Sequence, residues 1–168
     1  DHTAVLGDTL AKIAAEKAGI IKKGVPVVSA PQKEEALKVL ERVANLKGCE
    51  LTLVGRDIKF ERSDSSLDGQ HFCLSSFIFH SSNMAHALDL MIPLLGFNQI
   101  ENAATSYTAL GASGLEISEE AIQKGFAEVK WPARFEVVRR EPPVILDSAH
   151  NQDSFARLRE TLEEHFPG

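Results

Sequence analysis

The stretch of residues 142–151, PPVILDSAHN, combines side chains that can do chemistry with an apolar run. A carboxylate, a hydroxyl and an imidazole, those of Asp147, Ser148 and His150, follow the apolar residues 144–146, which are typical of a covered strand. In open α/β sheets, ligands bind at the carboxyl ends of strands, where helix N-termini leave backbone N–H groups for an anion. The stretch is therefore a candidate ligand site.

The same residues also allow a purely structural interpretation. Asn151 or Asp153 can cap the helix that the pattern predicts for residues 151–164, and Asp147 can satisfy a turn. Residue types alone leave both interpretations open.

Composition describes an ordinary globular protein. The 168 residues are 43% hydrophobic and 25% charged, which excludes disordered and collagen-like classes. The net charge of −6 argues against a nucleic-acid partner. No apolar run approaches the ~18 residues of a membrane span, and the first residues lack a signal peptide's basic region. Cys49 and Cys73 lack CxxC spacing, which predicts reduced thiols and a cytoplasmic location.

Hydrophobic periodicity predicts an α/β fold. The first half alternates helices and strands, with Asp8 as N-cap and Gly19 as C′ residue of the first helix, and this alternation predicts a parallel sheet with crossover helices. The next segment predicts short antiparallel strands with a turn at Asp68-Gly69, although residues 83–91 equally allow a helix. The expected helices are 8–19, 33–48, 99–112, one starting at Ser118, and 151–164; the expected strands are 25–30, 50–54, 58–62, 71–79, 86–92, 134–140 and 143–147.

Trp131-Pro132 interrupts the helical pattern and predicts a domain boundary near Val129. The expected domains are residues 1–128 and 129–168. Because two strands and a helix cannot cover their own apolar faces, the second domain is expected to be incomplete and the chain to be a fragment.

Four stretches carry a family resemblance: DHTAVLG at 1–7, EKAGIIKKG at 16–24, GFNQIENAA at 96–104, and WPARFEVV with ILDSAHN within 131–151. Their order and spacing resemble the folylpolyglutamate synthase and dihydrofolate synthase family of the Mur ligase superfamily. The resemblance covers essentially the whole chain. It implies the C-terminal part of a P-loop-type central ATPase domain with a small antiparallel section, followed by the start of a Rossmann-like ligase domain.

The resemblance also implies an activity. Such enzymes add L-glutamate to a folate or dihydropteroate carboxylate through an acyl phosphate, using ATP and Mg²⁺ and acting on small molecules, as monomers when full length. The P-loop pattern G-x-x-x-x-G-K-[ST] is absent from this sequence, so the chain alone is expected to be inactive. The motifs do not separate dihydrofolate synthase from folylpolyglutamate synthase activity.

Two catalytic roles follow from the resemblance. His2 matches the family's magnesium ligand, and Lys17 matches the lysine that is carbamylated in EKAGI. Structural alternatives exist for both: a surface histidine near a terminus, and a lysine that favours the carbonyl end of a helix dipole.

Four residues match the family's ATP contacts: Asn102, Arg134, Asp147 and His150, with Gln99 as a weaker companion. The resemblance places Asp147 and His150 at the ribose and phosphates, and Asn102 and Arg134 at the nucleotide. Many relatives have glycine where this chain has serine, between the aspartate and the alanine of ILDSAHN.

Each of these residues has a competing structural role. Asn102 could be a satisfied helix amide, and Arg134 could form a salt bridge with Glu136 or Glu141. Two other functions also fit the residue types, a non-catalytic α/β module and a metal-dependent hydrolase; the hydrolase would use Asp1, His2, Asp147 and His150. Metal ligands at the spacing of an HExxH motif would form a rigid metal site. The four residues of the proposed hydrolase do not have that spacing.

Overall fold

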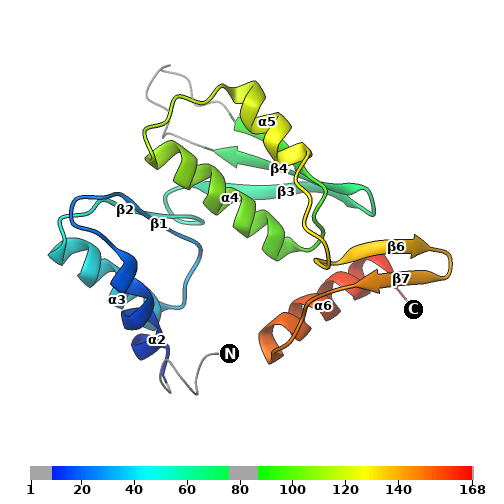
Figure 1. Cartoon of the computed structure of the whole chain (residues 1–168), viewed down its shortest axis with the longest axis horizontal. Coiled ribbons are helices and arrows are strands. Elements are labelled where there is room, and N and C mark those ends of the chain that lie inside the picture. Colours follow the sequence, from blue (N-terminus) through cyan, green and yellow to red (C-terminus); the bar gives the residue numbers. More distant parts are fainter. Residues whose placement is uncertain (1–8, 76–86, 168) are drawn as a thin grey trace.

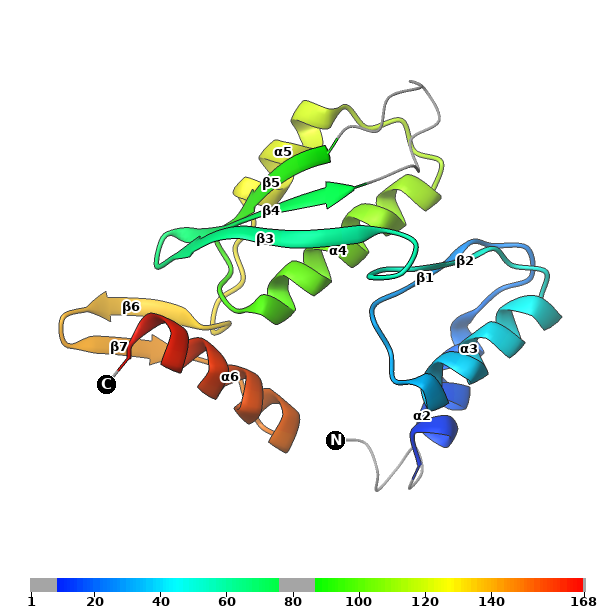
Figure 2. The same cartoon turned by 180° about the vertical axis from the view of Figure 1, so that it is seen from behind.

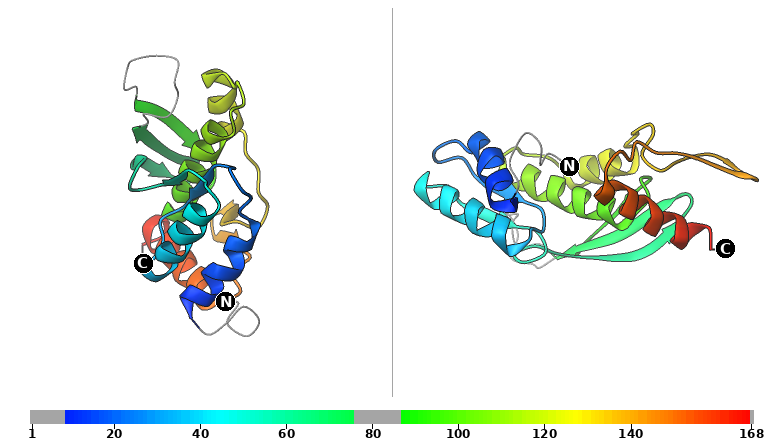
Figure 3. Two further views of the ribbon diagram at one scale, coloured as in Figure 1. Left: turned by 90° about the vertical axis from the view of Figure 1, so that its left-hand side faces the viewer. Right: turned by 90° about the horizontal axis from the view of Figure 1, so that it is seen from below.

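The structure is a computed structural model, and it describes residues 9–75 and 87–167. Its elements form three groups that succeed one another along the long axis of the molecule (Figures 1 and 2). The view from below shows the same succession, with the first group at one end and the last group at the other (Figure 3).

The first group is a parallel βαβ unit preceded by a helix. Helix α2 (Leu10–Lys17) runs into a short 3-10 helix, η1 (Ala18–Ile20), and then come strand β1 (Val27–Ser29), helix α3 (Glu34–Leu46) and strand β2 (Leu51–Leu53). β1 and β2 pair in parallel, with Val27 opposite Leu51, and α3 is the crossover. The parallel arrangement that the sequence predicts is confirmed.

Both ends of the first helix differ from the prediction. Thr9, not Asp8, is the N-cap, and its hydroxyl accepts from the backbone N–H of Lys12 at 3.3 Å; Asp8 lies outside the described residues. Gly19 is not a left-handed C′ residue but lies inside η1, because the chain tightens into a 3-10 turn instead of reversing. Gly48, with φ of 62°, does end α3 as predicted.

The middle group is an antiparallel sheet covered by two helices. Strands β3 (Lys59–Ser66), β4 (Gly69–Ser75) and β5 (Ala87–Ile92) are adjacent in chain order, and helices α4 (Phe97–Ala112) and α5 (Glu119–Ala127) lie on one face (Figures 2 and 3). Residues 87–92 form a strand, so the helical alternative is wrong there. The predicted turn at Asp68-Gly69 is confirmed, because Ser66 at the end of β3 pairs with Gly69 at the start of β4; the strand expected for residues 58–62 extends further, to Ser66.

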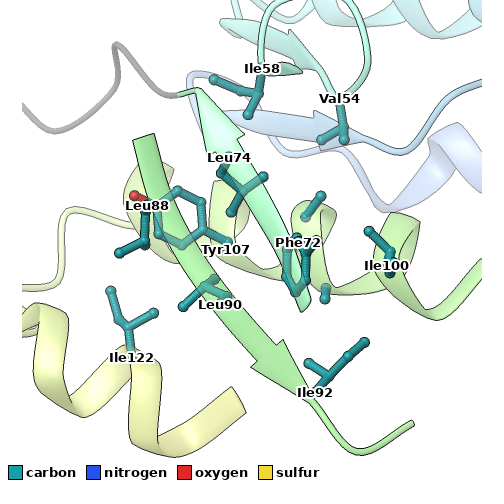
Figure 4. Close-up of a cluster of buried hydrophobic side chains, with 12 residues drawn as sticks. Val54, Ile58, Phe72, Leu74, Leu88, Leu90, Ile92, Ile100, Tyr107 and Ile122 are labelled. Atoms are coloured by element: carbon teal, nitrogen blue, oxygen red, sulfur yellow. The ribbon is translucent and has the colours of Figure 1, made fainter. Parts of the chain in front are cut away.

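The core lies between this sheet and its helices (Figure 4). Phe72 and Leu74 of β4 alternate with outward residues, as the period of two in a strand requires, and they contact the stripe of α4 that includes Ile100. The other labelled members are Val54, Ile58, Leu88, Leu90, Ile92, Tyr107 and Ile122. This core fixes where α4 begins, and α4 carries part of the candidate site.

The third group is a hairpin with one helix. Strands β6 (Glu136–Arg140) and β7 (Pro143–Leu146) pair antiparallel, and helix α6 (Gln152–His165) comes after them. The prediction of a covered strand is met only in part within the described residues, because Val144 and Ile145 are partly buried whereas Leu146 is 50% exposed. One helix covers only part of a two-stranded ribbon. The domain division near Val129 stays a prediction.

None of the helices formed by residues 9–75 and 87–167 combines the length and the apolar character needed to cross a membrane.

Candidate functional site

A cavity of about 260 Å³ lies between the start of α4 and the segment that leads into α6. All four predicted ATP contacts, Asn102, Arg134, Asp147 and His150, line it, and so does Gln99. The structure therefore brings together side chains that are up to 48 residues apart, from Asn102 to His150, in one place. Their roles toward a ligand stay predictions.

Asp147 organises the loop on one side of the cavity. Its Oδ2 accepts from the backbone N–H of Phe135 at 2.8 Å, and its Oδ1 accepts from that of Ala149 at 2.7 Å. The expected structural role in a turn is thus observed. Each carboxylate oxygen has a second lone pair, so Asp147 can hold the loop and still accept from the hydroxyls of a ligand.

The loop that carries Arg134 has an unusual backbone. Ala133 and Phe135, on either side of it, have φ values of 57° and 47°, which non-glycine residues rarely adopt. The carbonyl of Ala133 accepts from the N–H of Ser148 at 2.9 Å, which ties the loop to the segment after β7. Strain of this kind costs about 1–3 kcal/mol per residue and persists only where surrounding contacts enforce it.

The Arg134 side chain stacks on an aromatic ring. Its guanidinium carbon lies 5.5 Å from the centre of the Trp131 ring. The expected alternative, a salt bridge to Glu136 or Glu141, is wrong within the described residues; Glu136 instead accepts from the backbone N–H of Ala133 at 2.9 Å. A guanidinium stacked in this way is preoriented and keeps its fork of donors for a ligand.

His150 stands just before α6. Its Nδ1 lies 3.0 Å from the carbonyl oxygen of Ser148, and because a carbonyl only accepts, Nδ1 carries the proton. Nε2 is then available as an acceptor in the neutral ring and as a donor in the charged ring. The next residue, Asn151, forms a capping box with Ser154, so the predicted cap is confirmed.

Asn102 and Gln99 form the opposite wall. The Asn102 amide donates to Oε1 of Gln99 at 3.1 Å, so the structural interpretation of this asparagine is partly met. Asn102 is exposed and lines the cavity, and its side-chain oxygen Oδ1 has no hydrogen-bond partner among the described residues. It can therefore both donate to and accept from a ligand edge.

Sequence reasoning missed Arg157, which also lines the cavity and is partly buried. Its signal was available, since 153, 154, 157 and 161 recur at helical spacing on one face of α6 and all line the cavity. Asp153 is in this set as well, where the sequence suggested only a cap. The cavity is therefore lined by both arginines and carboxylates.

Of the two predicted catalytic residues, Lys17 is described by the structure and does not line this cavity. Lys17 is exposed in the last turn of α2, where its ammonium suits the helix dipole. His2 and Asp1 lie outside the described residues. Within residues 9–75 and 87–167, no three His, Cys, Asp or Glu side chains gather in a way that could hold a metal ion.

Comparison with known proteins gives consistent relatives. No protein-family model matches the sequence. The chain is 34% identical over 170 residues to the dihydrofolate synthase/folylpolyglutamate synthase of Bacillus subtilis, covering 99% of this chain and 38% of that protein. It is 35% identical over 151 residues to the Escherichia coli protein of the same name, covering 90% of this chain and 32% of that protein.

Solved structures agree. A crystal structure of folylpolyglutamate synthase from Thermotoga maritima superposes with a TM-score of 0.82 at 34% identity, covering 95% of this chain and 36% of that one. A structure described as an FPGS-AMPPCP-folate complex gives a TM-score of 0.88 at 30% identity, covering 100% and 40%. The chain thus spans well under half the length of the relatives it matches. The resemblance drawn from the motifs is confirmed: over nearly its whole length the chain is similar in sequence and in fold to part of a dihydrofolate synthase/folylpolyglutamate synthase.

Proposed function

We propose that the protein containing this chain is an ATP-dependent ligase that joins L-glutamate to the carboxylate of a folate or a dihydropteroate. The observation that carries the proposal is the single cavity lined by Asn102, Arg134, Asp147 and His150. The names of the relatives support the ligase class, and one similar structure is described as a complex with an ATP analogue and folate.

The residues present fit a nucleoside triphosphate. The Arg134 fork is free to pair with phosphate oxygens, and His150 stands beside the N-terminus of α6, which favours an anion. Asp147 accepts from the ribose hydroxyls with the lone pairs that the loop leaves unused, and Asn102 binds an edge of the nucleotide. In this way one cavity offers groups for each part of the ligand.

The substrate carboxylate takes the γ-phosphoryl group of ATP and ADP leaves; the amine of glutamate then attacks the acyl phosphate, and the amide forms with loss of inorganic phosphate and a proton. The chain contributes orientation and neutralisation of charge, the terms that dominate such a transfer. The roles of Lys17 as a carbamate and of His2 as a magnesium ligand stay proposals. Lys17 does not line the described cavity, and His2 lies outside the described residues.

The proposal also includes the division of the chain into two domains. Residues 1–128 are the C-terminal part of a central ATPase domain, and 129–168 begin a Rossmann-like ligase domain. Because the P-loop pattern is not in this sequence, we expect the chain alone to bind nucleotide weakly and not to turn over. A cytoplasmic, monomeric full-length protein stays a prediction.

The other two functions receive less support. A metal-dependent hydrolase would need Asp1 and His2, which lie outside the described residues, to join Asp147 and His150. A non-catalytic module gives no reason for four motif residues to share one cavity. The similar curated proteins are named as synthases.

The decisive experiment measures ATP-dependent incorporation of radiolabelled glutamate by the full-length protein, with dihydropteroate and tetrahydrofolate as alternative acceptors. We expect ADP and a glutamylated product with at least one acceptor. An intact, folded protein that releases no ADP with either acceptor overturns the proposal. The preferred acceptor decides between the two synthase activities.

A further inference from the structure

We propose that Arg62 and Gln70 are positioning residues that hold α6 and the start of α4 at the separation required by a nucleotide in the cavity between them. The inference rests on the proposed function, because it assigns the two residues a role in binding ATP. Neither residue lines the cavity or belongs to the sequence motifs.

Gln70 is a polar residue in an apolar core. It is fully buried on β4, and its Nε2 donates to the carbonyls of Leu94 at 2.6 Å and Gly96 at 2.9 Å. These two carbonyls belong to the segment that leads from β5 into α4. A buried amide is costly unless its groups are paired, so the pairing fixes the segment's position.

Arg62 completes the pairing of Gln70 from the other side. Its Nη1 donates to Oε1 of Gln70 at 3.2 Å and lies 2.8 Å from Oε1 of Glu164, a residue of α6. The guanidinium carbon also lies 5.9 Å from the ring centre of Phe97, the first residue of α4. Because arginine only donates and the carbonyls only accept, the orientation of the Gln70 amide is determined.

The two walls of the cavity are therefore connected through one cluster of side chains. α6 supplies Arg157 and, just before its start, His150; α4 supplies Asn102. Arg62 and Glu164 are 26% and 32% exposed, so the ion pair is partly shielded from water and is stronger than a surface pair. If the pair breaks, the position of α6 relative to α4 is less restricted, and binding a ligand that bridges both walls then costs additional ordering entropy.

The chain offers a matched control. Arg140 of β6 and Asp68 in the turn between β3 and β4 also form an ion pair between the middle and last groups, but both are exposed, and among the described residues neither forms a hydrogen bond with Gln70 or with residues 93–96. Asp68→Asn and Glu164→Gln make the same chemical change in the two pairs. If the ion pairs only held the middle and last groups together, either substitution would weaken that attachment. The proposed role predicts that the effect depends on Glu164.

The test compares Glu164→Gln, Asp68→Asn, Arg62→Met and Arg62→Lys in the full-length protein. We expect Glu164→Gln to raise the Kd for an ATP analogue and the KM for ATP about fivefold, with kcat changed less than about twofold. We expect Arg62→Lys, which keeps the charge, to restore part of the affinity lost in Arg62→Met. Asp68→Asn is expected to change the Kd by less than about twofold. Equal effects of Glu164→Gln and Asp68→Asn overturn the proposal.

A second measurement does not depend on ligase activity. Hydrogen exchange of residues 94–102, detected by mass spectrometry without nucleotide, reports whether the start of α4 loses protection. Glu164→Gln and the isosteric Gln70→Met are expected to increase exchange there, and the double variant to add little more than either single one. Unchanged exchange in Glu164→Gln overturns the proposal even if the protein is an active ligase. Conversely, increased exchange in a protein that binds no ATP would contradict the proposed function alone.

Discussion

The backbone N–H of Phe135 donates to the carboxylate of Asp147 at 2.8 Å, although Phe135 has a left-handed backbone conformation with φ of 47°. The bond joins the loop before β6 to the residue directly after β7. Asp147 therefore does two things at the candidate site: it holds the neighbouring loop in a costly conformation, and it offers its remaining lone pairs to the cavity.

Asp147→Asn should weaken both the attachment of the loop before β6 and the binding of a ligand in the cavity. An asparagine can accept from one of the two N–H groups, but its NH₂ group then faces the other, so one hydrogen bond is lost. We expect about tenfold weaker binding of an ATP analogue and a free energy of unfolding lower by about 1 kcal/mol. Calorimetric titration and denaturant unfolding measure the two effects.

Asp153→Asn is the control for that substitution. It removes a carboxylate from the same cavity, but Asp153 makes none of the loop's hydrogen bonds. Because a negative side chain opposes a bound phosphate, we expect ATP binding to be unchanged or tighter in this variant. An equal loss in Asp147→Asn and Asp153→Asn would show that net charge, not the geometry of Asp147, matters.

Arg134→Lys tests whether the stacked guanidinium matters beyond its charge. Lysine keeps the positive charge but lacks the planar fork and the stacking on Trp131. We expect about tenfold weaker binding of an ATP analogue in Arg134→Lys and a greater loss in Arg134→Ala. Trp131→Phe, which keeps a ring, should lose less than about threefold. Wild-type affinity in Arg134→Lys would refute the role given to the fork.

Asn151→Ala should destabilise α6 at the edge of the cavity. The Asn151 side chain accepts from the N–H of Ser154 at 2.9 Å, and the hydroxyl of Ser154 accepts from the N–H groups of His150 and Asn151. Loss of such a cap costs about 1 kcal/mol, which thermal unfolding can detect. Gln152→Ala changes the next residue without removing the cap, and equal melting temperatures for the two variants would contradict the prediction.

Gly96→Ala should push α4 and α6 apart. Gly96 has φ of 97°, and a Cβ there would lie 2.7 Å from Oγ1 of Thr161 and 2.8 Å from Oδ1 of Asn98. We expect a loss of about 1–3 kcal/mol in the free energy of unfolding. Gly19→Ala is the control, because a Cβ at Gly19 meets nothing within 4 Å and its φ is not left-handed. A similar cost for both would mean that the contact with Thr161 is unimportant.

Much of the fold was predictable because local patterns agree with tertiary packing. The stripe of α4, with Ile100, Ala103 and Tyr107, is buried as its spacing predicts, and Ser118 caps α5 as expected. The end of α2 was not predictable, since a glycine in EKAGI fits a C′ position as well as it fits a 3-10 turn. The direction that the chain takes toward β1 decides between a C′ conformation and a 3-10 turn. The presence of the glycine does not decide it.

The candidate site was predictable only where motifs carry it. Asn102 and Arg134 were found through the family resemblance, whereas Asp147 and His150 were also indicated by their position after an apolar strand, and the structure places all four around one cavity. The left-handed conformations of Ala133 and Phe135 could not be foreseen, because neither residue type favours φ above zero.

The pairing of Arg62 with Glu164 could not be predicted from sequence patterns either. The two residues are 102 positions apart, and no local periodicity relates them. Such contacts depend on how the third group packs against the middle sheet, which the hydrophobic pattern does not specify.

The close approach of Gly96 and Thr161 has a consequence for the history of this protein. A side chain at position 96 is tolerable only if residue 161 is smaller than threonine, so the two positions are expected to covary among homologous sequences. Thr161→Ala should accordingly recover part of the stability that Gly96→Ala removes. The extent of covariation between the two positions would show how strongly natural selection has maintained the close packing of the two helices.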